Sequence, residues 1–480
     1  MNQNRTKFEK SARKSDFKQA SGGQFRGSGP MEVVMFNMSS FSEWEKGVVN
    51  RNYHIFRSLA GREEVGRIIA VDFLPFTFKR VLRNYWENII KSAKCKVKNE
   101  KHKITNIYRD LTTKCIKIDG YPAELYVFST IDSIFSHQRV IDKLNKVLKK
   151  IDQLPNYPIT QLPNYPITQL PDYPITQLPN YPITRLPRLV WSYFPMFVDY
   201  FNKIPRDLTV FDAVDNWTEH PSFARYRKLL EANYRIIGEK SDLIFTVAPT
   251  LCDFFKDLGR EKDCYFIPLG VDVEHFQRSD LSRRPDIKDI PRPIIGYIGT
   301  IQNRVDLDLV EYLIKKNLDK SFVFIGPIWP AYLKRTKSLK KYKNVYLLGR
   351  KPYSQAPAYI KNFDVAIIPH YVDAFMKYTG SLKLLEYLAC GRPVVSTPAS
   401  GVERFLPLVY VARDSEDFNK KIDQALKDDT IELRDRRVER ARSQDWKLQV
   451  GKMMEIIKNK KPKIKNKKYK HKNVKILWEG

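Results

Sequence analysis

The chain has 480 residues, 42% of them hydrophobic, and a net charge of +30, so we expect two globular domains with appendages and an attraction for polyanions. Its five cysteines are scattered without a CxxC pair, which argues against a disulfide or zinc framework and for a reducing compartment. No signal peptide and no apolar run of about 18 residues is visible, so we predict no membrane span and a cytoplasmic location.

The first segment with apolar periodicity begins after residue 30. Residues 1–30 are rich in Ser, Gly, Gln and Lys, and we expect them to be disordered. A strand is predicted over 32–38, a helix over 51–60 and a second strand over 67–71. This order is how a nucleotide- or acceptor-binding α/β domain begins.

Residues 76–98 are predicted to form a basic amphipathic helix. Its apolar side consists of Val81, Leu82, Tyr85, Trp86, Ile89 and Ile90. The remainder is crowded by Lys79, Arg80, Arg83, Lys91 and Lys94. Aromatic rings beside cations suit contact with an anionic membrane surface, and a helix packed on its own domain with a solvated basic face is equally compatible.

An internal repeat, QLPNYPIT, occupies residues 153–184 in four copies, with Asp172 replacing Asn in the third. Two prolines per copy prevent a helix and remove ladder donors from any strand. We therefore expect an extended, exposed insertion in a loop, with no part in catalysis.

The sheet continues on both sides of this repeat. Strands are predicted over 125–129, 189–193, 209–213 and 243–247, and helices over 131–151 and 226–240. Polar residues follow the strand that ends at 213, where open α/β sheets place their ligands: Asp212, Asp215, Asn216 and Trp217. Asp215 is a candidate for handling an acceptor, or a cap of the next helix.

A second α/β unit follows a polar, charged stretch (277–292) that we interpret as a linker. Strands are predicted over 294–297, 322–326, 345–349 and 365–369, and helices from 305 and over 359–364. Asp306 and Asp308 mimic a DxD metal motif, but they fall at helical spacing among apolar residues rather than at a strand end, so we reject a metal site there.

The segment from Tyr378 to Pro398, YTGSLKLLEYLACGRPVVSTP, is the most informative part of the chain. Gly380 and Ser381 open a helix, which Gly391 ends before a short strand. Free amides and the positive end of the helix dipole suit a phosphate, and Glu386 can accept hydrogen bonds from vicinal hydroxyls. An ordinary helix–strand unit of a doubly wound sheet has the same pattern.

This segment resembles the donor site of the group 1 glycosyltransferases with the GT-B fold, of the type that makes exopolysaccharides or teichuronic acids. FIPLGVDVEHF (266–276) also resembles the element that ends the N-terminal domain in that family. The resemblance implies two Rossmann-like domains facing across a cleft: an acceptor domain (31–280) and a donor domain (290–435). A last helix (443–457) would cross back to the first domain, before a basic tail (458–480) that carries ten lysines between 458 and 475.

The resemblance also implies roles for individual residues. The donor would be a nucleotide sugar linked to UDP or GDP, bound without a metal or other cofactor. Its site would be formed by Gly299, Arg304, Arg350, Gly380, Ser381, Lys383 and Glu386. On the acceptor side, Asp215 and His54 are the catalytic candidates, with Gly47 and Arg51 nearby.

The expected activity is retaining transfer of a sugar to a glycan or lipid-linked acceptor in cell-surface polysaccharide synthesis. One departure concerns the Glu-x7-Glu pattern, in which Tyr378 replaces the first glutamate, near the donor sugar. Residues 76–98 and 458–475 are expected to contact an anionic membrane surface. The alternatives are a sugar-nucleotide epimerase of the same fold and a basic nucleic-acid-binding protein, although the chain lacks a recognised module that reads nucleic acid.

Overall fold

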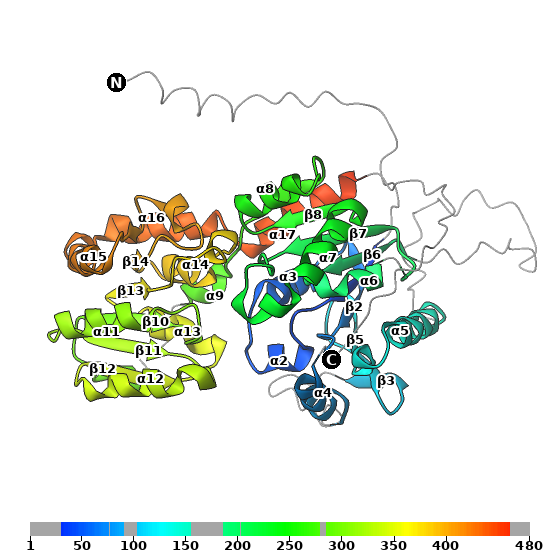
Figure 1. Cartoon of the computed structure of the whole chain (residues 1–480), viewed down its shortest axis with the longest axis horizontal. Helices are drawn as coiled ribbons and strands as arrows, with labels where there is room; N and C mark the ends of the chain where they lie inside the picture. Colours follow the sequence, from blue (N-terminus) through cyan, green and yellow to red (C-terminus); the bar gives the residue numbers. More distant parts are fainter. Residues whose placement is uncertain are drawn as a thin grey trace, which may run out of the picture.

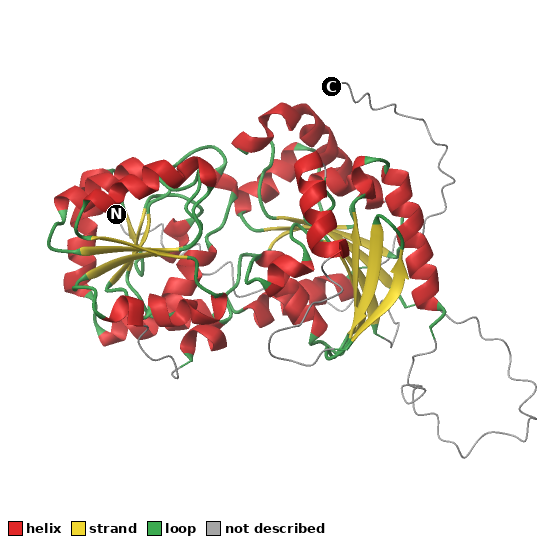
Figure 2. Ribbon diagram, turned by 90° about the horizontal axis from the view of Figure 1, so that it is seen from below, coloured by secondary structure: helices red, strands yellow, loops and turns green. Residues whose placement is uncertain are grey.

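The protein folds into two α/β bodies that lie side by side, each with a central sheet between layers of helices (Figures 1 and 2). The computed structural model describes residues 30–75, 77–90, 103–154, 186–201, 203–278 and 285–460. The expectations for residues 1–29, for the repeat beyond Leu154, for 91–98 and for the tail beyond Lys460 lie outside these ranges.

The first sheet has nine strands in the order β3-β4-β5-β2-β1-β6-β7-β8-β9. Their bounds are β1 Met31–Phe36, β2 Val65–Val71, β3 Ile104–Arg109, β4 Thr113–Ile118, β5 Glu124–Thr130, β6 Arg188–Ser192, β7 Leu208–Ala213, β8 Leu243–Thr246 and β9 Cys264–Phe266. Strands β3, β4 and β5 pair antiparallel, and all other neighbours pair parallel. The central strand β1 is buried throughout, as its run of apolar residues requires.

Helices cover both faces of this sheet. One core layer lies between the sheet and α5 (His137–Asp152), α6 (Val198–Phe201), α7 (Arg227–Lys240) and α8 (Pro249–Asp257). The opposite layer includes α3 (Arg51–Ala60) and the last helix, α17 (Trp446–Asn459). Helix α17 thus packs on the first sheet although it follows the second sheet in sequence.

The second sheet is entirely parallel, in the order β12-β11-β10-β13-β14-β15. Its strands are β10 Ile294–Ile298, β11 Ser321–Ile325, β12 Val345–Gly349, β13 Val365–Ile368, β14 Val394–Ser396 and β15 Tyr410–Val411. One face packs against α11 (Leu307–Lys316) and α15 (Ser415–Asp428), and the other against α9 (Val273–Gln277), α13 (Ala356–Ile360), α14 (Leu382–Ala389) and α16 (Ile431–Arg442). A fold of two doubly wound domains was predicted from the sequence, and it is confirmed.

Within the stretch 277–292, which we interpret as a linker, α10 (Pro285–Lys288) packs Ile287 into the second core. Two expectations need correction. The helix expected at 359–364 lies earlier, as α13. Within residues 77–90, the structure has α4 (Phe78–Asn84) followed by a π-helical turn, Tyr85–Ile90.

The apolar residues of this last segment do not share one environment. Val81 and Ile89 are buried, whereas Leu82 and Trp86 are 59% and 55% exposed. Within the described residues, no helix is both long and apolar enough to cross a bilayer.

Candidate active site

The two sheets meet at an ion pair between side chains that follow their strands. Asp215 lies just beyond β7 of the first sheet, and Arg304 lies beyond β10 of the second. An Nη atom of Arg304 is 3.6 Å from Oδ2 of Asp215. Because ligands of open α/β sheets bind beyond the carboxyl ends of strands, this junction is where a ligand shared by both domains would lie.

The Arg304 guanidinium is surrounded by aromatic rings as well as by this carboxylate. It lies 4.9 Å from the centre of the Phe375 ring, whose other neighbour is His220 at 4.7 Å. Burial, and then the charge of Arg304, lowers the pKa of His220 to about 4. Burial raises the pKa of Asp215 to about 6, although the neighbouring Arg304 opposes this shift. The site therefore has one firm cation and a carboxyl that titrates near neutrality.

Helix α7 fixes the loop that carries Asp215 through hydrogen bonds of Tyr234. The Tyr234 hydroxyl donates to the Asp215 carbonyl oxygen at 2.9 Å and accepts from the Trp217 amide at 3.2 Å. Tyr234 is fully buried, so its position is set by core packing. The direction of the Asp215 side chain is consequently determined by α7 rather than by the loop alone.

In the second domain, Gly299 leaves room for the Lys383 side chain. The φ of Gly299, +146°, is rarely adopted by other residues, and a Cβ placed on Gly299 would lie 2.1 Å from Cε of Lys383. Gly326 packs against the Gly299 backbone in the same way, since its Cβ would lie 2.1 Å from the Gly299 carbonyl oxygen. Two glycines thus let the Lys383 side chain cross the end of β10, where its ammonium lies 5.6 Å from the centre of the Tyr297 ring.

Helix α14 presents its N-terminus and two charged side chains. Ser381 is the N-cap, and its hydroxyl accepts from the Leu384 amide at 3.3 Å. Gly380 fits against Leu269 of the first domain, because a Cβ would come within 2.7 Å of a Leu269 methyl carbon. Burial lowers the pKa of Lys383 and raises the pKa of Glu386, and each residue's charge opposes the other's shift.

The structure adds His370, which the sequence does not single out. It follows β13, is 5% exposed, and neither ring nitrogen has a hydrogen-bond partner among the described residues. Burial, then the charges of Lys383 and Arg304, holds its pKa well below 6.5. His370 is thus a neutral imidazole close to both cations. A lone histidine after a strand gives no periodic signal from which this position could be predicted.

Some predicted residues lie apart from the Asp215–Arg304 junction. His54 is buried, stacks on Trp446 of α17 at 5.0 Å, and has its pKa lowered to about 3 by burial. Arg51 pairs with the buried carboxylate of Asp212 at 2.9 Å and donates to the Pro268 carbonyl oxygen. Both therefore belong to the packing between α3, α17 and the sheet, and an acceptor role for Arg51 would require this pair to open.

Arg350 and Gly47 lie at the seam between the two domains. The Arg350 guanidinium donates to the Lys46 carbonyl oxygen at 2.7 Å, and a Cβ on Gly47 would contact the Tyr353 backbone nitrogen at 3.7 Å. The loop before α3 thus touches the loop after β12. Arg350 holds this contact while remaining exposed.

The DxD-like residues have structural tasks. Asp306 caps α11 by accepting from the Asp308 and Leu309 amides, and Asp308 pairs with Arg335 at 2.7 Å. Across the described part of the chain, no three or more His, Cys, Asp or Glu side chains gather closely enough to hold a metal ion.

Comparison with known proteins shows which family and which solved structures the chain resembles. The family description "Glycosyl transferases group 1" matches residues 292–428, which contain Gly299, Arg304, Lys383 and Glu386. TuaH of Bacillus subtilis (strain 168), a glycosyltransferase assigned to teichuronic acid biosynthesis, is 26% identical over 281 residues, or 54% of this chain and 68% of TuaH. Residues 292–428 of the chain therefore match the group 1 glycosyltransferases.

Solved structures agree with this identification at the level of the fold. Anabaena HepE in complex with UDP and glucose superposes with a TM-score of 0.55 at 12% identity, covering 89% of this chain and 99% of HepE. Sucrose-phosphate synthase from Thermosynechococcus elongatus gives 0.58 at 12% identity, covering 89% and 98%. The GT-B architecture and the group 1 resemblance, both predicted from the sequence, are confirmed.

Tyr378 occupies the position at which the sequence resemblance leads us to expect the first glutamate of a Glu-x7-Glu pattern. The Tyr378 ring packs 6.2 Å from the Phe254 ring of α8, and the Thr250 hydroxyl donates to the Lys377 carbonyl oxygen at 2.7 Å. The 3₁₀ turn Met376–Tyr378 therefore holds the donor domain against α8 of the first domain. In this glycosyltransferase, position 378 is part of the contact between domains.

Proposed function

We propose that the transferase moves a sugar from a nucleotide-sugar donor to a glycan or lipid-linked acceptor in cell-surface polysaccharide synthesis. The observation that carries the proposal is the convergence of Arg304, Lys383 and the α14 N-terminus around the glycine-lined end of β10. Two cations and a helix N-terminus form a site for a diphosphate.

The chemistry requires stabilisation of a leaving nucleoside diphosphate. Breaking the anomeric C–O bond places negative charge on the β-phosphate, which Arg304 and Lys383 would offset as it develops. The amides of Gly380 and Ser381 belong to the same binding surface, and Glu386 would accept hydrogen bonds from the ribose hydroxyls. Because these groups supply positive charge themselves, we propose that the transfer proceeds without a bound metal.

We infer that UDP-sugars are the first donors to test, with GDP-sugars next. This preference is supported by the fold neighbours, of which Anabaena HepE has been solved with UDP-glucose and with UDP and glucose. Arg350 lies on the donor domain where the base would be held, and Asp215 faces the same junction from the acceptor domain, where it would orient the attacking hydroxyl. His54 remains an acceptor-side candidate of lower priority because of its stacking on Trp446.

We further propose that the acceptor is met at an anionic membrane surface on its cytoplasmic side. Residues 78–90 support this, because Phe78, Leu82, Trp86 and Ile90 are 69%, 59%, 55% and 38% exposed at four-residue intervals. Arg83, between them, has a side chain that is 57% exposed and that pairs with Glu43 at 3.2 Å and with Glu87 at 3.6 Å. Exposed rings beside cations suit the interface of an anionic bilayer, and the lysines of 458–475 would add electrostatic attraction.

A donor screen tests the proposal. The full chain is incubated with UDP-, GDP-, ADP- and dTDP-sugars, and the released nucleoside diphosphate is quantified. We expect slow hydrolysis of one donor class, at least tenfold slower in Glu386→Gln and unchanged in Glu455→Gln, an exposed carboxylate on α17. A folded protein that neither hydrolyses nor binds any donor would overturn the proposed function.

A further inference from the structure

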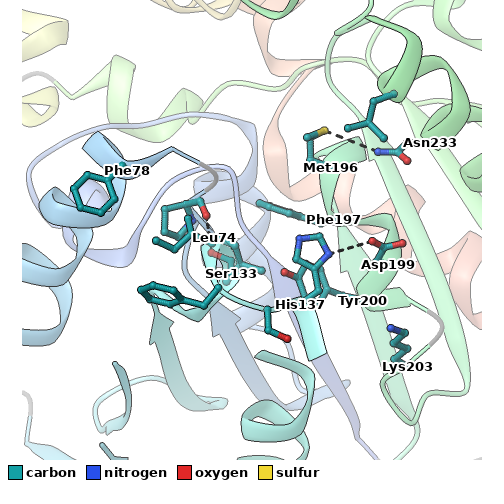
Figure 3. Close-up of a pocket in the computed structure, with 15 residues that line it drawn as sticks. Leu74, Phe78, Ser133, His137, Met196, Phe197, Asp199, Tyr200, Lys203 and Asn233 are labelled. Carbon is teal, nitrogen blue, oxygen red and sulfur yellow. Dashed lines mark hydrogen bonds and ion pairs between the residues drawn. The ribbon is translucent and has the colours of Figure 1, made fainter. Parts of the chain in front are cut away.

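One unassigned feature is a cavity in the first domain, lined by residues other than those of the Asp215–Arg304 junction. It has a volume of about 740 Å³, within the range of small-molecule sites. Figure 3 shows it between the start of α4, the turn before α5, the segment leading into α6, and α7. These elements come from four separate parts of the sequence, which is why the sequence gives no sign of the cavity.

The walls of this cavity are mostly apolar and its mouth is aromatic. The lining includes Leu74, Pro75, Ile134, Met196 and Phe197. At the mouth, Phe78 and Phe135 are 69% and 58% exposed, an unusual degree for two phenylalanines next to a cavity. Such walls exclude a purely polar ligand and favour a hydrocarbon chain.

The other end of the cavity is polar. His137 Nδ1 lies 3.1 Å from Asp199 Oδ2, and Figure 3 shows the imidazole directed at that carboxylate. Lys203 lines the same end, and its ammonium contacts the neutral Gln138 amide oxygen at 3.4 Å. Asn233 is buried and turns its amide nitrogen toward the Met196 sulfur at 3.9 Å, a weak partner. Lys203 and Asn233 therefore have donors to offer a polar group.

The cavity is continuous with the exposed apolar stripe of residues 78–90. Phe78 belongs to both, and Leu82, Trp86 and Ile90 extend the stripe along the same helical segment. Helix α4 has basic residues and no carboxylate of its own, and although its Arg83 pairs with Glu43 and Glu87, the remaining positive charge favours an anionic surface. A chain leaving an anionic membrane along this stripe would meet the cavity mouth first.

We propose that this cavity binds the hydrocarbon chain of a lipid-linked acceptor, with the phosphate of that lipid at Lys203. The proposal rests on the proposed function for the identity of the ligand as an acceptor, while binding of the lipid chain can be tested without transfer. Helix α7 connects the two sites, because Asn233 lines the cavity and the adjacent Tyr234 holds the Asp215 loop. A lipid anchored here would keep its glycan on the acceptor side of the junction.

The test uses decyl phosphate below its critical micelle concentration, titrated into the full chain by calorimetry, with decyl β-glucoside as an uncharged probe. We expect saturable binding of decyl phosphate, at least fivefold weaker binding of the glucoside, and affinity that increases from hexyl to decyl phosphate. Equal affinity for both probes would overturn the assignment of the phosphate to Lys203. Absence of saturation would overturn the cavity as a lipid site.

Two variants separate the cavity from the stripe. Leu229→Trp places a larger ring at a half-buried lining position, and we expect it to weaken decyl phosphate binding at least tenfold without altering binding to anionic vesicles. The double variant Leu82→Ser/Trp86→Ser changes residues outside the lining. We expect it to weaken binding to anionic vesicles without altering decyl phosphate binding. If both variants lost decyl phosphate binding and vesicle binding alike, with thermal unfolding unchanged, both ligands would be binding to one continuous apolar surface. That result would overturn the proposal.

The proposed function and this inference fail differently. Donor hydrolysis does not require the lipid chain, so Leu229→Trp should hydrolyse the donor at the rate of the unmodified protein. Lipid binding without hydrolysis of any donor would refute the transferase proposal but leave a lipid site. Donor hydrolysis without lipid binding would refute the lipid site alone.

Discussion

Gly299 is constrained both by its backbone conformation and by the side chain that crosses it. Its φ of +146° disfavours a Cβ, and the Lys383 methylene chain occupies the space that a Cβ would need. Lys383 is one of two cations proposed to face the donor diphosphate. A methyl group at position 299 would therefore act on the site by moving Lys383.

We predict that Gly299→Ala lowers donor hydrolysis at least tenfold. The matched control is Gly259→Ala, in a turn where φ is +87° and nothing lies within 4 Å of the added Cβ. Both variants should lose about 1–2 kcal/mol of unfolding free energy to backbone strain, but only Gly299→Ala should lose donor turnover. Urea unfolding and nucleoside diphosphate release measure the two effects. Equal turnover in the two variants would contradict the proposed role of the glycine.

Asp215 should give the reaction an acidic limb in its pH profile. Burial raises its pKa to about 6, so the carboxylate that pairs with Arg304 is progressively lost as the pH falls through 6. We predict that transfer to an acceptor decreases below this pH, and that Asp215→Asn is slow at all pH values and lacks this limb. The measurement is kcat/KM for transfer between pH 5 and 8.

Stability provides the control for this profile. Because the folded-state pKa of Asp215 lies above the ordinary value of 3.8, protonation of this group stabilises the fold as the pH decreases from about 6 towards 4. Acid inactivation with an intact thermal transition is therefore expected. An acid limb that persists unchanged in Asp215→Asn would assign it to another group, with Glu386 the next to examine, since burial raises its pKa as well.

At the level of single residues, the sequence predicts which side chains lie together on α14 better than it predicts the surroundings of α3. Lys383, Glu386 and the Ser381 cap lie on one short helix, so their relation follows from spacing alone. His54 and Arg51 also share a helix, but the partners that occupy them, Trp446 and Asp212, come from distant parts of the chain. Spacing carries no information about such partners.

At the level of elements, α17 packs a segment from the C-terminal part of the chain onto α3 and the first sheet. Trp446, at its first position, is buried, stacks with His54 and lies 5.8 Å from the Arg51 guanidinium carbon. Gly270 fits directly against this indole, since a Cβ would lie 2.6 Å from it. The helix therefore docks through one large ring inserted between the first sheet and the segment that leads to the second.

We predict that Trp446→Ala destabilises the protein by about 3–5 kcal/mol, the range for truncating a buried aromatic side chain. Leu448→Ala is the control on the same helix, because Leu448 is 52% exposed, and its effect should stay within about 0.5 kcal/mol. Urea unfolding followed by circular dichroism measures both. Similar stability of the two variants would show that α17 is not needed to hold the first domain.

Elements that the sequence fails to predict share a weak apolar pattern. Strands β3 and β4 form the antiparallel edge of the first sheet. Their sequences contain polar side chains at both exposed and buried positions, such as Thr105, Asn106 and Lys114, so they lack a clear apolar alternation. Helix α16 buries only Arg437 and Ala441, so its pattern of hydrophobic residues is almost absent. By contrast, parallel strands such as β1 and β10 are apolar apart from Glu32, and they are predicted within one or two residues.

For the whole molecule, the proposed membrane contact rests on two separate features, the net charge of +30 and the exposed stripe of residues 78–90. Under that proposal, each alone would give weak, reversible attachment, and together they would give stable binding to an anionic surface. The two-domain fold places the stripe on the first domain, where the acceptor is expected (Figure 1). The second domain reaches the neighbourhood of the stripe through Arg350, which donates to the carbonyl oxygen of Lys46, the partner of Glu87. This arrangement would hold the acceptor domain at the surface while the donor enters from solution.

We predict that the full chain sediments with vesicles that contain 30% anionic lipid at least tenfold more strongly than with neutral vesicles. Raising the salt from 0.1 to 0.5 M should remove most of this preference, since the Debye length falls from about 10 Å to below 5 Å. Leu82→Ser/Trp86→Ser should weaken binding to both vesicle types, whereas removal of residues 461–480 should weaken only the anionic case, because the two changes delete the apolar and the electrostatic signal respectively. If the double variant bound both vesicle types as the unmodified chain does, the stripe would have no part in membrane contact, and attraction between the basic side chains and the lipid headgroups would account for all of the binding.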